Sequence, residues 1–184
     1  FDRKRIGDIE ASARSRGRDQ FARRIAEESA VLLKNEMDIL PLRATAETSI
    51  VVIGAAGDRE PMIAGGGSGH VNPPYVVTPF AGIRERVGAG KGKGQERVTD
   101  DDGANVARAV EAAKGSSVAI VVVGFTSSEG DDRENLSLPG DQDILIAALS
   151  EAQPRTIVVI NGVGAVLMPW ESRDGKSVVE GKRE

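Results

Sequence analysis

Three continuous apolar runs, rich in β-branched residues, stand out along the chain. Each is short and is bounded by glycine or polar residues. Runs of this kind are typical of strands buried on both faces of a parallel sheet. The predicted strands are Ile50–Ile53, Ser117–Val123 and Thr156–Ile160.

Other segments place their apolar residues at helical spacing. We therefore predict helices over 20–34, 103–114 and 140–152. The apolar stripe of the first helix contains Phe21, Ile25, Ser29 or Ala30, and Leu32 or Leu33. In the last helix we expect inward-facing Ile144, Leu145, Ala148 and Leu149.

The alternation of strands and helices predicts an α/β fold, a three-layer α/β/α sandwich with a mostly parallel sheet. Open sheets of this class bind ligands outside the carboxyl ends of their strands. We therefore expect functional residues in the loops 54–69, 124–133 and 161–170.

Two glycine-rich segments lack the spacing of a phosphate-binding loop. The run 87–94 does not match G-x-x-x-x-G-K-[ST] and follows no predicted strand, so we expect a solvated surface connection there. Gly65, Gly67 and Gly69 do not match G-x-G-x-x-G, and no acidic residue ends the following strand at the expected place. The sequence therefore gives little support to nucleotide binding.

Composition and charge narrow the function classes. The 184 residues are 40% hydrophobic and 28% charged, which is ordinary for one globular domain. The net charge of −4, with Lys and Arg mixed among acids, favours neither nucleic-acid nor membrane partners. The absence of cysteine excludes disulfides, thiolate nucleophiles and Cys-based metal sites. Apolar runs too short to cross a bilayer predict a soluble chain, whose localisation stays open.

The loop after the second predicted strand concentrates ionisable residues around Gly130, namely Glu129, Asp131, Asp132, Arg133 and Glu134. A glycosidase needs one carboxyl that protonates the leaving oxygen and a second that attacks or activates water. The alternative is a solvated acidic turn before a helix, where the helix dipole favours acids. From residue types alone, the acidic turn is the favoured interpretation.

Five segments carry a resemblance that changes this balance. In order, they are AEESAVLLKNE with ILPL, IVVIG, GGGSGHVNPPYVVTP, VVVG with SEGDDRENLSLPGDQDILI, and VVINGVGAVLMPW. Together they resemble the C-terminal α/β sandwich domain of family 3 glycoside hydrolases, the β-glucosidase family. The set covers roughly residues 20–170 and is more specific than any single motif.

The resemblance implies roles for individual residues. Glu129 matches the glutamate that serves as acid/base in retaining hydrolysis. Ser68, next to Gly67, matches a serine that reaches the sugar in the first subsite, although a turn-capping serine is an equally good interpretation. Asp132 and Arg133 match an Asp-Arg pair, for which we expect a loop-shaping role and no sugar contact. From the residues themselves, we expect Arg133 to pair with Asp131 or Asp132 and so to hold the loop in shape.

Two further residues are expected to be structural. His70 is the only histidine, so it cannot belong to a His cluster for a metal, and we expect an ordinary loop residue. Trp170 is expected in the core and not on a sugar face. We expect neither a metal nor a cofactor.

The family's nucleophile has no match in this chain, because it is an Asp on an N-terminal barrel that the resemblance does not reach. The resemblance implies that residues 1–19 are a linker from that barrel and that residues 20–170 form the sandwich. The half-charged segment 171–184 is expected to be an irregular or truncated tail.

Two functions stand as alternatives. In the first, the chain and an N-terminal barrel together hydrolyse terminal β-D-glycosyl residues of β-glucosides or related oligosaccharides, and the chain alone is nearly inactive. In the second, the chain is a non-catalytic carbohydrate- or partner-binding module derived from the same domain.

Overall fold

A six-stranded sheet organises the chain. The computed structural model describes residues 16–35, 37–45, 47–63, 67–68, 70–73, 75–88, 97–130, 132–171 and 176–182. The strands are β1 (Ala30–Asn35), β2 (Ile50–Ile53), β3 (Val98–Asp101), β4 (Val118–Gly124), β5 (Thr156–Gly162) and β6 (Lys176–Lys182). The helices are α2 (Arg16–Ser29), α3 (Pro79–Val87), α4 (Val106–Lys114) and α5 (Gln142–Ala152), with a short 3-10 turn, η1, at Ala55–Gly57. None of the helices among these residues is long and apolar enough to span a membrane.

The sheet is mostly parallel, as predicted. Its strand order is β1-β6-β5-β4-β2-β3, and every neighbouring pair is parallel except β1 with β6. The three strands predicted from the sequence, β2, β4 and β5, lie next to one another. All seven residues of β4 are buried, which explains why this strand is apolar without alternation.

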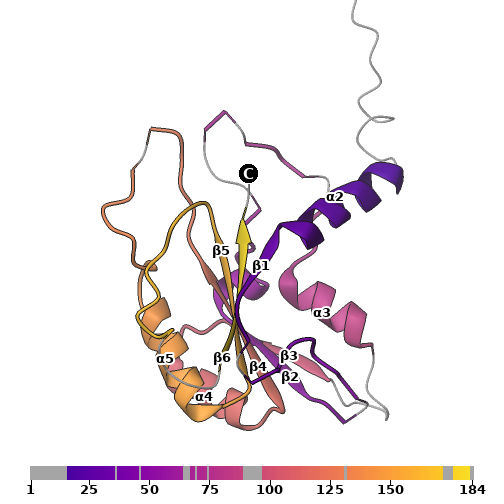
Figure 1. Cartoon of the computed structure of the whole chain (residues 1–184), viewed down its shortest axis with the longest axis vertical. Coiled ribbons are helices and arrows are strands. Elements are labelled where there is room, and N and C mark those ends of the chain that lie inside the picture. Colours follow the sequence, from indigo (N-terminus) through magenta and orange to yellow (C-terminus); the bar gives the residue numbers. More distant parts are fainter. Residues whose placement is uncertain are drawn as a thin grey trace, which may run out of the picture.

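Alternate residues of the central strands point to opposite faces, and each face has its own apolar cluster. Val51 and Val121 pack with α4 and α5, whereas Val52 and Val122 pack with Phe80 of α3. Figure 1 shows α4 and α5 on one side of the sheet and α3 on the other. The predicted three-layer α/β/α arrangement is therefore confirmed.

The chain changes direction across the sheet between β2 and β4. After β2 it passes through α3 on one face to the edge strand β3, and it then returns through α4 on the other face to β4, on the far side of β2. Such a switch point leaves a crevice at the carboxyl ends of the two strands, because their outgoing connections diverge to opposite faces.

The prediction of one helix over 20–34 is wrong. The helix α2 ends at Ser29, whose hydroxyl donates to the carbonyl of Ala26 at 2.9 Å, and the chain continues as strand β1. Residues of β1 pair with β6, a partner far away in the sequence, and this pairing outweighs the local helical spacing. The predicted apolar stripe is exposed, with Phe21 at 66% and Ile25 at 53%.

The prediction of an irregular tail is also wrong for residues 176–182. They form β6, which lies between β5 and β1 and is hydrogen-bonded to both. Val178 is fully buried in the core. Charged residues do not prevent such a strand, because the ladder is made by backbone groups. Of the predicted linker, residues 1–15 lie outside the described residues, and 16–19 belong to α2.

Two elements have no counterpart among the sequence predictions. Helix α3 begins after Thr78, whose side chain accepts a hydrogen bond from the amide of Ala81 at 3.1 Å, and Pro79 occupies its first turn. Strand β3 has no apolar run that would predict it, because only Val98 and Asp101 of its four residues are buried and only Val98 is apolar.

We predict that two substitutions in α5 differ sharply in their effect on stability. Leu149 is fully buried, whereas Ile144, expected inward from the sequence, is 59% exposed. Leu149→Ala should lower the free energy of unfolding by about 2–5 kcal/mol, because it leaves a cavity. Ile144→Ala should change it by no more than about 0.5 kcal/mol. Urea denaturation of both variants would measure the difference, and equal losses would contradict the assigned helix face.

Candidate functional site

Two loops bring Glu129 and Ser68 together at the carboxyl edge of the sheet. Ser68 lies in the connection after β2, and Glu129 lies in the connection after β4. The two residues are 61 positions apart in the sequence. They meet because β2 and β4 are parallel neighbours, so that their outgoing loops leave the same edge side by side.

Ser68 binds both carboxylate oxygens of Glu129. The backbone N–H of Ser68 donates to Oε2 at 2.8 Å, and its hydroxyl donates to Oε1 at 2.9 Å. Both residues are exposed to solvent. The pairing therefore fixes an accessible carboxylate in one orientation by two charge-assisted hydrogen bonds.

Gly67 leaves the room that this pairing needs. Its φ of +86° lies in the left-handed region that favours glycine. A Cβ atom built on Gly67 would lie 2.8 Å from Oε2 and 2.9 Å from both Cβ and Cγ of Glu129. Gly67 and Ser68 therefore form a cradle for the Glu129 side chain, and we call these three residues the carboxylate clamp.

The clamp holds Glu129 in its ionised form. The backbone N–H of Ser68, and then its hydroxyl, lower the pKa of Glu129 below the usual value of a glutamate, and partial desolvation opposes them. Hydrogen bonds to the charged form stabilise it, so Glu129 is a carboxylate at neutral pH. In this state it can accept a proton. To act as an acid, Glu129 must first be protonated, and the hydrogen bonds from Ser68 oppose this protonation.

Arg133 lies in the loop that carries Glu129, and it contacts two backbone carbonyls and an aromatic ring. Its guanidinium donates to the backbone carbonyls of Ala165 and Ser137, each at 2.8 Å, and lies 3.7 Å from the ring centroid of Phe125. Among the described residues it makes no ion pair with Asp132, which is exposed. The other expected partner, Asp131, lies outside the described residues, so the expected pairing with one of these two aspartates stays a prediction.

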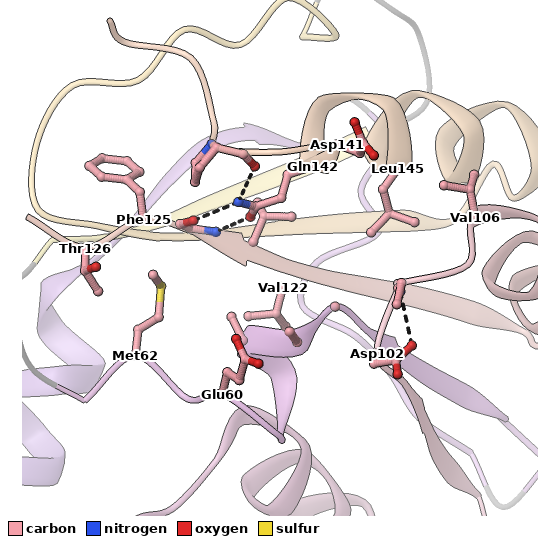
Figure 2. Close-up of a pocket in the computed structure, with 18 residues that line it drawn as sticks. Glu60, Met62, Asp102, Val106, Val122, Phe125, Thr126, Asp141, Gln142 and Leu145 are labelled. Carbon is pink, nitrogen blue, oxygen red and sulfur yellow. Dashed lines mark hydrogen bonds between the residues drawn. The ribbon is translucent and has the colours of Figure 1, made fainter. Parts of the chain in front are cut away.

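Beneath the two loops lies a pocket of about 510 Å³ (Figure 2). It occupies the switch point, between Gly54 at the end of β2 and Gly124 at the end of β4. Its volume falls within the usual range of small-molecule sites. Neither Ser68 nor Glu129 lines it, so the pocket and the clamp are separate features of the same pair of loops.

Gln142 closes one wall of this pocket. Its Oε1 accepts from the N–H of Gly124 at 2.7 Å, and its Nε2 donates to the carbonyls of Gly124 and Pro139 at 3.0 and 2.9 Å (Figure 2). These bonds tie the start of α5 to the end of β4, where the Glu129 loop begins. Sequence analysis missed this role, although Gln142 stands at a typical helix start, after Pro and Gly in LPGDQ.

The charges around the pocket disfavour a phosphate ligand. Glu60, Asp102 and Asp141 line it, and no Lys or Arg is among the described residues of its walls. The nearby Arg59 and Arg108 already form ion pairs with Asp102. The acidic lining of the pocket would repel a phosphate group. This agrees with the sequence, which matches no nucleotide-binding motif.

The two residues expected to be structural lie as predicted. Trp170 is 2% exposed, and its Nε1 donates to Oδ1 of Asp143 at 2.8 Å, so its assignment to the core is confirmed. His70 is exposed, and its Nε2 lies 3.2 Å from Oδ1 of Asn72.

We predict that Gly67→Ala and Gly140→Ala both cost stability and yet differ at Glu129. Both glycines have positive φ, so each alanine should lower the free energy of unfolding by about 1–2 kcal/mol. Only at Gly67 would the new methyl group strike Glu129, because nothing lies within 4 Å of a Cβ at Gly140. Gly67→Ala should therefore raise the pKa of Glu129, and Gly140→Ala should not. Carboxyl ¹³C NMR titration measures this, and identical Glu129 titrations in the two variants would contradict the cradle.

Comparison with known proteins finds relatives over most of the chain. It is 36% identical over 169 residues to thermostable beta-glucosidase B of Acetivibrio thermocellus, which covers 88% of this chain and 22% of that protein. It is 35% identical over 156 residues to a beta-xylosidase of Formosa agariphila, which covers 78% of this chain and 21% of that protein. The chain thus spans about a fifth of the length of these relatives.

Solved structures show the same fold. The crystal structure of DesR, a beta-glucosidase from Streptomyces venezuelae in complex with D-glucose, matches with a TM-score of 0.81 and 25% identity, over 90% of this chain and 35% of that one. The model of the glycosyl hydrolase family 3 C-terminal domain matches residues 30–182, which include all six strands of the sheet. The chain therefore belongs to the glycosyl hydrolase family 3 C-terminal domain family, as its resemblance implied.

Proposed function

We propose that this chain supplies the general acid/base of a retaining β-glycosidase, and that Glu129 is that residue. The observation that carries the proposal is the clamp: an exposed carboxylate, fixed through both oxygens, at the edge of the sheet where this class of fold binds ligands. Family membership supports it, because the relatives include a beta-glucosidase and a beta-xylosidase.

The second carboxyl of the reaction belongs, in this proposal, to an N-terminal barrel outside this chain. In retaining hydrolysis the nucleophile and the acid/base lie about 5–5.5 Å apart on the two sides of the glycosidic bond. The proposed barrel would therefore have to cover the exposed edge that carries Glu129. The alignment with only about a fifth of each relative leaves room for such a domain.

Glu129 would act in two steps. In the first, protonated Glu129 gives its proton to the glycosidic oxygen while the barrel aspartate attacks the anomeric carbon, so that the alcohol leaves and a glycosyl ester forms. In the second, the Glu129 carboxylate takes a proton from water while the water oxygen attacks the anomeric carbon, so that the sugar is released and the barrel aspartate leaves as a carboxylate. The carboxylate state described here is the one that the second step requires.

The proposed substrates are β-glucosides or related oligosaccharides with a terminal non-reducing β-D-glycosyl residue. Ser68 is the proposed sugar contact, with Gly67 as the small neighbour that lets a ring approach closely. Asp132 and Arg133 have no proposed contact with the sugar. For Arg133 we propose a loop-shaping role, supported by its two hydrogen bonds to backbone carbonyls.

The alternative function, a non-catalytic carbohydrate-binding module, is favoured by one observation. The clamp engages both oxygens of Glu129 within the chain and lowers its pKa. A module needs an ionised carboxylate as a hydrogen-bond acceptor, and it needs no acid.

We predict that hydrolysis of an aryl β-D-glucoside requires both this chain and a family-type barrel, and that it depends on Glu129. In the mixture, Glu129→Ala should lower the rate by about 10²–10⁴-fold, the usual contribution of a general acid/base. Added azide should partly restore turnover, because it attacks the glycosyl ester without needing a base. Glu134→Ala is the matched control, since Glu134 is also exposed and lies in the same loop.

Each other result has a clear meaning. Turnover by this chain alone would show that the nucleophile is not on a separate barrel. Glucose binding by an inactive mixture would favour the module. Equal losses in Glu129→Ala and Glu134→Ala would remove Glu129 from the acid/base role.

A further inference from the structure

The single proton of the Ser68 hydroxyl can be donated either to Glu129 or to a sugar oxygen, but not fully to both. A serine hydroxyl has one proton to donate. In the structure this proton is donated to Oε1 of Glu129 at 2.9 Å. A sugar hydroxyl that accepted the same proton would leave Oε1 without that bond.

Glu129 faces two demands, which differ between the two steps of the proposed reaction. As a base it must be ionised, and as an acid it must carry a proton. Both influences that lower its pKa come from Ser68, and no charged group among the described residues adds to them. Among the described residues, Ser68 is therefore the one whose hydrogen bonds favour the ionised form of Glu129.

We propose that Ser68 is a positioning residue that couples sugar capture to the protonation of Glu129. Without a ligand, the hydroxyl of Ser68 holds the carboxylate. A sugar hydroxyl that accepts the proton of Ser68 releases Oε1, so that Glu129 is more readily protonated when there is an oxygen to protonate. This inference rests on the proposed function, from which it takes the sugar and the acid role.

The backbone of the clamp keeps Glu129 in place during this exchange. The N–H of Ser68 binds Oε2 at 2.8 Å independently of the hydroxyl, and a ligand that takes the hydroxyl need not disturb it. The side chain of Glu129 also occupies the space that a Cβ on Gly67 would fill. The carboxyl therefore stays at one place while its affinity for protons changes.

The first test measures the pKa of Glu129 in the 184-residue chain by carboxyl ¹³C NMR. Ser68→Ala should raise this pKa, because the hydroxyl bond is lost and the N–H bond remains. Ser68→Thr should keep it near the wild-type value, because the hydroxyl is restored. Ser137→Ala is the control, since Ser137 lies in the Glu129 loop and its hydroxyl makes no hydrogen bond with the described residues. An unchanged pKa in folded Ser68→Ala overturns the proposal.

The second test repeats the titrations with glucose, and the amide signal of Ser68 reports binding. In the wild type, glucose should raise the pKa of Glu129 toward the value that Glu129 has in Ser68→Ala without glucose. In Ser68→Ala, glucose should change the pKa much less. Glucose that shifts the amide of Ser68 but leaves the pKa of Glu129 unchanged overturns the coupling. Glucose that fails to shift this amide at any concentration overturns it too.

These outcomes separate this inference from the proposed function, because neither test requires hydrolysis. If the titrations behave as expected but the mixture with the barrel is inactive, the coupling stands and the acid/base role fails. If hydrolysis depends on Glu129 while Ser68→Ala leaves its pKa unchanged, the acid/base role stands and the coupling fails.

Discussion

The burial of β4 on both faces is the constraint on which the rest of the structure depends. All seven of its residues are buried, and it is hydrogen-bonded to β2 on one side and to β5 on the other. A strand in this position has no side chain free to meet solvent, so its polar chemistry must begin where it ends. Its last residue is Gly124, and Glu129 follows within five residues. Because β2 runs parallel to β4, the loops that carry Ser68 and Glu129 leave the sheet at the same edge.

Tight packing also fixes the base of these loops. A Cβ on Gly124 would lie 2.0 Å from the carbonyl oxygen of Asn161, and Gln142 holds both backbone groups of Gly124. A Cβ on Gly54, at the end of β2, would lie 2.2 Å from the carbonyl oxygen of Val122. Both strand ends are thus pressed against their neighbours. The loops that carry Ser68 and Glu129 therefore start from closely packed strand ends, although the two residues themselves are exposed.

The sequence predicted the centre of the fold better than its edges, and the reason is physical. Strands β2, β4 and β5 are apolar on both faces. Such continuous apolar runs can be recognised in the sequence even when the neighbouring strands are unknown. Edge strands depend on partners that local patterns do not reveal. Strand β1 lies in a predicted helix because Ala30 and Leu32 continue the helical spacing of α2, yet these residues pair with Gly181 and Val179. Strand β6 does not stand out in the sequence because its segment is rich in charged residues, whereas its pairing with β1 and β5 is made by backbone groups.

The candidate site divides in the same way. Resemblance to the family identified Glu129 and Ser68 as functional candidates, and parallel-sheet topology placed both at one edge. Neither could reveal that Ser68 binds Glu129, because a contact across 61 residues between two irregular loops has no local signature. Gln142 was missed for a related reason. Its side chain binds the backbone of Gly124. Almost any residue at position 124 would offer the same backbone groups, so the sequence does not reveal this contact.

The clamp places a definite requirement on the proposed reaction. A general acid works best when its pKa is near the working pH, and glycosidases usually achieve this by desolvating the carboxyl. In this chain Glu129 is exposed and its pKa is lowered, which suits a base and opposes an acid. A barrel that covered this edge would exclude water and raise the pKa, and a sugar that took the hydroxyl of Ser68 would raise it further. Both changes require substrate and barrel at the same place as Glu129. The acid would then be available only in the assembled complex, and the isolated domain would keep its carboxylate ionised.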